Sequence, residues 1–127
     1  KASWENIIET YLYSRKENQL QLIALLVDIR HSPSKDDITM YQWLKGYGLN
    51  TIIIATKADK ISRSQINPRI NDIKKVLQLD NTIKVIPFSS EKRMGIEEVW
   101  SEIEAYLVKL DNSLDNTNQI NEADNKE

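Results

Sequence analysis

Residues 50–60 carry the most explicit chemistry in this 127-residue chain. They read NTIIIATKADK, an apolar run that ends in the polar tetrapeptide Thr56-Lys57-Ala58-Asp59. A guanine base presents two adjacent donors, N1–H and the exocyclic amino group, and one ionised carboxylate accepts both. Adenine has an acceptor at N1, so the same carboxylate would lose that pairing. We therefore predict that Asp59 reads a guanine base.

The neighbours of this carboxylate, and a second polar loop further along the chain, supply the other expected contacts. Lys57 is expected to lay its methylene stem along the base plane, with its ammonium free to reach backbone carbonyls. The Thr56 hydroxyl is expected to tie neighbouring loops together. The backbone N–H of Ser90 is expected to donate to guanine O6, which would reject the amino group of adenine. Ser89 is expected to shape that turn.

The remaining polar residues suggest no second reactive site. The chain has no cysteine, which excludes a thiol nucleophile and a zinc–thiolate site. None of its three glycines belongs to a G-x-x-x-x-G-K-[ST] phosphate loop, so the sequence offers nothing to cradle phosphates or to hold magnesium. His31 is expected at the surface or in a supporting role, and Asp28 and Arg30 as a structural ion pair.

Composition places the chain among ordinary globular domains. It has a net charge of −2, 40% hydrophobic residues and 28% charged residues, which gives no global attraction to nucleic acid or membrane. No apolar run approaches the roughly 18 residues that cross a bilayer, and the start shows no signal region. We expect a cytoplasmic protein. The start also lacks Met and enters an amphipathic pattern at once, which suggests a piece of a longer protein.

Hydrophobic periodicity predicts the elements that position these residues. Ser34 and Asp37 resemble a capping box for a helix that ends near Gly46 or Gly48. Asn67 is expected to cap a helix with Pro68 in its first turn. The expected helices cover residues 3–16, 34–46, 67–77 and 96–110, and the expected strands cover residues 21–28, 51–55 and 83–88.

This alternation predicts an α/β fold, with a parallel sheet between two layers of helices. Ligands of such sheets bind beyond the carboxyl ends of the strands, where the three polar clusters fall. Pro87 is expected to place the third strand at a sheet edge, and the strand ending at Asp28 is expected to have an unpaired edge. Trp4, Trp43 and Trp100 are expected in the core. Residues 111–127 are so polar that a disordered tail is expected.

The sequence resembles a known family. Thr56-Lys57-Ala58-Asp59 resembles the fourth guanine-nucleotide motif of P-loop GTPases, and Phe88-Ser89-Ser90 the fifth. Asp28-Ile29-Arg30-His31-Ser32-Pro33 narrows the resemblance to the EngB/YsxC family of bacterial ribosome-assembly GTPases. Residues 1–110 resemble the C-terminal part of the G domain, with the N-terminal strands of a partial P-loop NTPase fold missing. Glu91 departs from the Lys that many GTPases carry, which argues against base stacking there.

The resemblance implies functions for the full-length protein. It implies binding of GTP and GDP, slow GTP hydrolysis, and a Mg²⁺ cofactor with ligands upstream of this chain. It also implies a role in assembly of the large ribosomal subunit, with that subunit or its rRNA as the partner. It also implies a link to cell division and septation. This chain by itself is expected to be inactive and to supply guanine recognition. The implied base-binding residues are Thr56, Lys57, Ala58, Asp59, Phe88, Ser89 and Ser90.

Two other interpretations remain open on the residues. The Thr-Lys-Ala-Asp sequence is short enough to occur by coincidence in a non-catalytic α/β interaction module. A flavodoxin-like or receiver-like domain is weaker, because it would need an acidic cluster after an earlier strand. A phosphate-loop motif upstream of Lys1 would distinguish the GTPase from the module.

Overall fold

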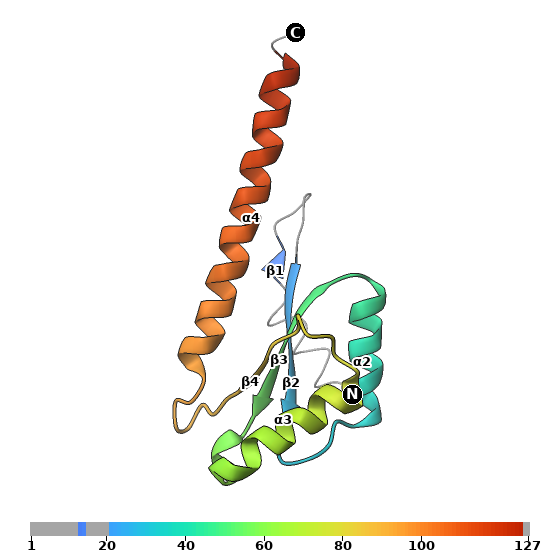
Figure 1. Ribbon diagram of the computed structural model, residues 1–127, viewed down its shortest axis with the longest axis vertical. Helices are drawn as coiled ribbons and strands as arrows, with labels where there is room; N and C mark the ends of the chain where they lie inside the picture. Colours follow the sequence, from blue (N-terminus) through green and yellow to red (C-terminus); the bar gives the residue numbers. More distant parts are fainter. Residues whose placement is uncertain (1–12, 15–20, 126–127) are drawn as a thin grey trace.

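The computed structural model describes residues 13–14 and 21–125, and its sheet confirms the predicted α/β fold. The sheet has the order β1-β2-β3-β4, in which β2, β3 and β4 run parallel and β1 pairs antiparallel with β2 (Figure 1). The register pairs Leu22 with Asn50 and Ile53 with Val85. The strands are β1 (Tyr13–Ser14), β2 (Gln21–Asp28), β3 (Asn50–Thr56) and β4 (Val85–Pro87).

Helices lie on both faces of the sheet and make three layers (Figure 1). Helices α2 (Lys35–Gly46) and α3 (Arg63–Leu77) cover one face, and α4 (Ile96–Asn125) covers the other. Alternate residues of β2 point to opposite faces. Ile23 packs in the cluster under α2 and α3, whereas Ala24 packs in the cluster with Tyr106 of α4. Burial on both faces explains why β2 and β3 are continuous apolar runs.

Several local predictions are confirmed. Strand β2 has the predicted bounds, and Ser34 and Asp37 form the predicted capping box at the start of α2. Pro87 lies in the last strand of the sheet order, where its missing donor costs no ladder bond on the outer side. The next residue restores the ladder, because the Phe88 N–H donates to the carbonyl of Ala55 at 2.8 Å. Strand β4 is shorter than the predicted residues 83–88.

The predicted start of the third helix is wrong. Ser62, not Asn67, caps α3, and Gln65 completes a capping box with it. The Gln65 side chain accepts from the Ser62 N–H at 3.3 Å, so the cap lies five residues before the predicted one and the helix begins at Arg63. Pro68 consequently lies inside α3, where it removes one intrahelical donor.

The two ends of the chain also differ from the predictions. Residues 3–16 were expected to be helical, but Tyr13–Ser14 form β1, which satisfies edge groups of β2 at Leu22 and Gln21. The rest of that predicted helix, with Trp4, lies outside the described residues. Helix α4 continues to Asn125 instead of ending at Leu110 before a disordered tail. No glycine or proline lies in residues 96–127 to stop it. A domain boundary at residue 110 stays a prediction.

Two tryptophans expected in the core are exposed. Trp43 is 49% exposed and Trp100 is 58% exposed. Each lies beside an inward residue of its helix, Leu44 and Val99 respectively, and the 100° step between helical neighbours turns it away from the core. Trp43 instead contacts Tyr47, with ring centroids 4.6 Å apart.

Within the described residues, β2 has a strand neighbour on its β1 side only at Gln21 and Leu22.

Gly95 sets how closely α4 approaches the end of β4. Its φ is +81°, and an added Cβ would lie 2.2 Å from the Pro87 carbonyl oxygen. We expect Gly95→Ala to lower the free energy of unfolding by about 1–3 kcal/mol or more, through backbone strain and this clash. Urea unfolding monitored by tryptophan fluorescence measures the change.

Gly46→Ala is the matched control for this substitution. No atom lies within 4 Å of a Cβ added at Gly46, at the end of α2. We expect no loss of stability, or a gain of up to about 1 kcal/mol from helix propensity. Equal effects of the two substitutions would contradict the steric argument.

Candidate functional site

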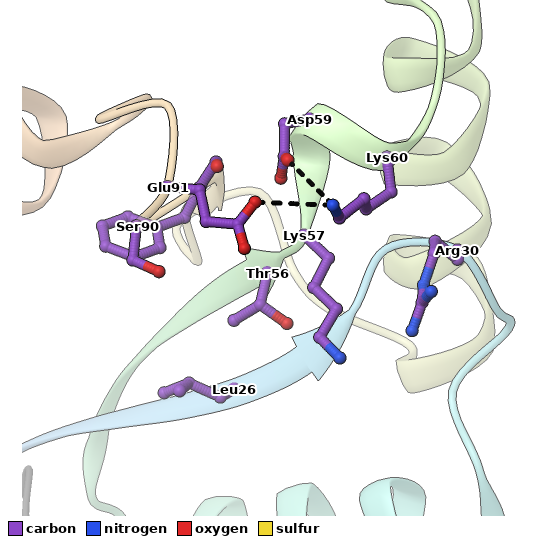
Figure 2. A pocket seen from close by; sticks show the side chains of 10 residues that line it. Leu26, Arg30, Thr56, Lys57, Asp59, Lys60, Ser90 and Glu91 are labelled. Atoms are coloured by element: carbon purple, nitrogen blue, oxygen red, sulfur yellow. Dashed lines mark hydrogen bonds and ion pairs between the residues drawn. The ribbon is translucent and has the colours of Figure 1, made fainter.

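A pocket of about 500 Å³ lies at the carboxyl ends of the three parallel strands (Figure 2). Loops that follow β2, β3 and β4 all contribute to its wall, as the polar clusters in the sequence predict. Of the seven predicted base-binding residues, six line the pocket, and Ala58 lies behind it, buried to 1% exposure. The lining residues are Leu26, Arg30, Thr56, Lys57, Asp59, Lys60, Phe88, Ser89, Ser90 and Glu91.

Asp59 presents an ionised carboxylate to this pocket. Its side chain is 9% exposed. The Ser89 hydroxyl is the main group that holds the pKa of Asp59 below its usual value, against the opposing effect of burial, and Lys60 contributes less. Ser89 is itself 2% exposed, and its Oγ accepts a hydrogen bond from the Lys92 N–H at 3.0 Å. The hydroxyl of Ser89, on the loop after β4, thus favours the ionised form of Asp59, on the loop after β3.

Backbone hydrogen bonds hold these two loops together. The Ala58 N–H donates to the Phe88 carbonyl at 3.0 Å, one step beyond the bond between Phe88 and Ala55. The Thr56 hydroxyl donates to the Val27 carbonyl at 3.2 Å, which ties the end of β3 to the end of β2. This bond joins two strands, and the predicted role of Thr56 in tying the loops together stays a prediction.

Lys57 adopts a backbone conformation that ordinary side chains rarely take. Its φ is 63° and its ψ is 31°, in the left-handed region, immediately before the short 3-10 helix η1 (Ala58–Lys60). Such a conformation costs a non-glycine residue about 1–2 kcal/mol. The turn carries the Lys57 side chain along the pocket wall toward the end of β2 (Figure 2).

Arg30 is a lining residue that the sequence predicted only as half of an ion pair. That pair is confirmed: Arg30 Nη2 lies 2.7 Å from Asp28 Oδ2, and Nε donates to Oδ1 at 3.0 Å. The Arg30 hydrogen bonds lower the pKa of Asp28 to about 2 from its usual 3.8. Because the folded-state pKa is depressed, the pair stabilises the fold above about pH 4, and this contribution is lost as the pH falls toward 2.

Helix α3 fixes the loop that carries Arg30. Arg69 Nε donates to the Ile29 carbonyl at 2.9 Å, and the Ser32 hydroxyl donates to Asp72 Oδ2 at 2.8 Å. No local pattern in the sequence predicts these contacts, because the partners are 40 residues apart. The wall formed by Arg30 is therefore held from two sides, by Asp28 on β2 and by α3.

Leu26, Lys60 and Glu91 were also missed as lining residues. Lys60 and Glu91 directly follow the two predicted motifs, and this adjacency was the available signal. Leu26 belongs to the uniformly apolar middle of β2, residues 22–27, so its place at the pocket depends on the sheet.

Among the described residues, no group of three or more His, Cys, Asp or Glu side chains could hold a metal ion. The Mg²⁺ ligands implied by the resemblance were expected upstream, and they stay a prediction. Among the described helices, none is both long enough and apolar enough to cross a membrane.

Comparison with known proteins identifies the relatives of this chain. It is 54% identical over 103 residues to the probable GTP-binding protein EngB of Clostridioides difficile, a match that covers 81% of this chain and 50% of the relative. The proteins of the same name from Levilactobacillus brevis and Alkaliphilus metalliredigens are 49% and 44% identical, over 83% and 86% of this chain and 52% and 51% of those relatives. No family model matches the chain.

The fold and the pocket define part of an α/β domain with a pocket beyond the carboxyl ends of a parallel sheet, where such sheets bind their ligands. The chain belongs to the EngB family, as the C-terminal part of its G domain. It spans about half the length of the curated relatives it matches.

The effect of the Ser89 hydroxyl on Asp59 can be measured as a change in the pKa of that carboxylate. We expect Ser89→Ala to raise the pKa of Asp59 toward its usual value, because the hydroxyl that favours the ionised form is removed. A pH titration of the Asp59 carboxyl carbon by NMR measures this shift. Ser90→Ala is the control, since it removes a neighbouring exposed hydroxyl and should leave the Asp59 pKa in place. Equal shifts in both variants would contradict this role.

Proposed function

We propose that this chain binds the guanine base of GTP and GDP, and that the protein to which it belongs is a GTPase. Asp59 accepts N1–H and the exocyclic amino group of the base. The stem of Lys57 covers one face of the base, and the N–H of Ser90 donates to guanine O6. The loop after β3 and the loop after β4 are called here the two reading loops. They are held in register by Thr56, Ala58, Phe88 and Ser89.

The carrying observation is the almost buried carboxylate of Asp59 at the pocket wall, whose ionised form the Ser89 hydroxyl favours. Lysine and arginine are the more frequent partners of a buried carboxylate, and a direct pair with one of them would consume its acceptor sites. A hydroxyl contributes one donor and leaves lone pairs available. Such a carboxylate suits a ligand with two adjacent donors. The names of the relatives, as probable GTP-binding proteins, support the same nucleotide.

The resemblance supports the remaining parts of the proposal. The full-length protein hydrolyses GTP slowly with Mg²⁺, and residues outside this chain hold the phosphates and the metal. It acts in the cytoplasm in assembly of the large ribosomal subunit, with a consequence for cell division and septation. This chain supplies the choice of base and no hydrolytic group.

Asp59→Asn tests the base reader directly. We expect the 127-residue chain to prefer guanosine 5′-monophosphate (GMP) over the adenosine analogue (AMP), with a Kd on the order of 1 mM. The substitution should weaken GMP binding at least tenfold, because two charge-assisted hydrogen bonds are lost. It should strengthen binding of the xanthosine analogue, whose C2 oxygen accepts from the new amide. Nitrogen–proton NMR titrations measure all three ligands.

Asp36→Asn is the matched control, because it removes an exposed carboxylate from the first turn of α2, away from the pocket. It should leave all three affinities unchanged. Unchanged GMP binding in Asp59→Asn, or equal binding of GMP and AMP by the original chain, would overturn the proposal and favour an interaction module.

The missing phosphate loop gives a second prediction. We expect this chain to bind GMP, GDP and GTP with affinities within about threefold of one another, because the free energy comes from the base. The same titrations, carried out with and without Mg²⁺, test this. Micromolar binding of GTP by the isolated chain would contradict it.

A further inference from the structure

Lys60 connects the two reading loops at the mouth of the pocket. Its Nζ lies 3.4 Å from Glu91 Oε2 and 3.6 Å from Asp59 Oδ2 (Figure 2). Glu91 follows Ser90 on the loop after β4, whereas Lys60 ends η1 after β3. The ammonium therefore lies between the carboxylate that reads the base and a second carboxylate on the other loop.

The two contacts of this ammonium have different consequences for the pocket. A tight pair with Asp59 would occupy the acceptor that a base needs, but the 3.6 Å separation exceeds ordinary hydrogen-bond length. The contact with Glu91 is slightly shorter, at 3.4 Å, and is also long, so the ammonium is shared between the two carboxylates. Without Lys60, Asp59 and Glu91 would be two like charges on adjacent loops, which disfavours the ionised form of each.

We propose that Lys60 and Glu91 form a positioning pair for Asp59. Glu91 withdraws the Lys60 ammonium from the reading carboxylate, while the ammonium keeps the two loops together and offsets their negative charge. The pair acts on recognition of the guanine amino group through Asp59 and does not itself contact that group. This inference rests on the proposed function.

The pair is exposed, which determines where its effect should appear. The Lys60 side chain is 49% exposed and that of Glu91 is 69% exposed, so solvent screens the attraction and it contributes little to the stability of the fold. Its effect on a carboxylate that is 9% exposed is screened less. Loss of the pair should therefore change ligand choice more than melting temperature.

Glu91→Gln tests the pair with two nucleotides that differ in one group. Inosine 5′-monophosphate (IMP) keeps the N1–H of GMP but lacks its exocyclic amino group, so the ratio of their affinities isolates the bond between that amino group and Asp59 and cancels effects on the phosphate. We expect the ratio to fall roughly threefold as Lys60 moves onto Asp59. The melting temperature should stay within about 2 °C of the original. Glu104→Gln, an exposed acid on α4, is the control and should change neither quantity.

A double-mutant cycle identifies Lys60 as the partner. Lys60→Gln should also lower the ratio, and the double variant should lose less than the two single losses combined, because the pair is already broken in each. The loss in Glu91→Gln should shrink in 0.5 M salt. Additive losses would overturn the proposal. So would an unchanged ratio in Glu91→Gln, or equal weakening of GMP and IMP accompanied by a fall in melting temperature.

The outcomes separate this inference from the proposed function. If the original chain prefers GMP over AMP and Asp59→Asn removes that preference, the proposed function stands whatever the Glu91 variant does. If the preference is absent, both fail together. If the preference for GMP over AMP is present but the GMP-to-IMP ratio is unchanged in Glu91→Gln, only the proposal about the Lys60–Glu91 pair is overturned.

Discussion

Continuation of the β3–β4 ladder into the following loops is the constraint on which the pocket depends. Phe88 donates to Ala55 and accepts from Ala58, so the two polar segments leave the sheet as bonded neighbours. The buried sheet fixes this register, because a slip of one residue would turn the apolar side chains of β3 to the wrong faces. Gly95 completes the arrangement by letting α4 begin against the backbone of Pro87. The packing of the core and the geometry of the pocket therefore depend on the same strand register.

The electrostatics of the pocket follow from this arrangement. Asp59 owes its low pKa first to the hydroxyl of Ser89, and a nearby ammonium contributes less. Asp28 shows the opposite design, in which a forked pair with Arg30 lowers the pKa to about 2 and occupies both oxygens. The first carboxylate keeps acceptor capacity for a ligand, whereas the second is structural. Lys57, whose side chain lines the pocket, has a strained left-handed backbone. Backbone strain of this kind is typical of residues whose side chains face a ligand site.

The chain spans about half the length of the curated relatives it matches. In the proposed function it accordingly supplies one part of the activity, recognition of the base. A carboxylate can discriminate between bases without any contact to phosphate, since the discriminating donors lie on the purine ring. Affinity and hydrolysis need backbone amides and a metal, which the proposal assigns to residues outside this chain. Recognition of the base is therefore separable, in principle, from the chemistry on the phosphates.

The sequence by itself determined the order of strands and helices from β2 to α4, the three polar clusters at the strand ends and the candidate reader Asp59, because apolar periodicity and local motifs are properties of neighbouring residues. It did not predict β1. The prediction from Pro68 misplaced the cap of α3, which Ser62 and Gln65 form instead. Trp43 and Trp100 were predicted in the core, but both are exposed. Only the tertiary structure joined Ser89 to Asp59, Glu91 to Lys60 and α3 to the Arg30 loop. These contacts link residues about 30 to 40 positions apart, and their distances are set by the sheet register and by helix docking.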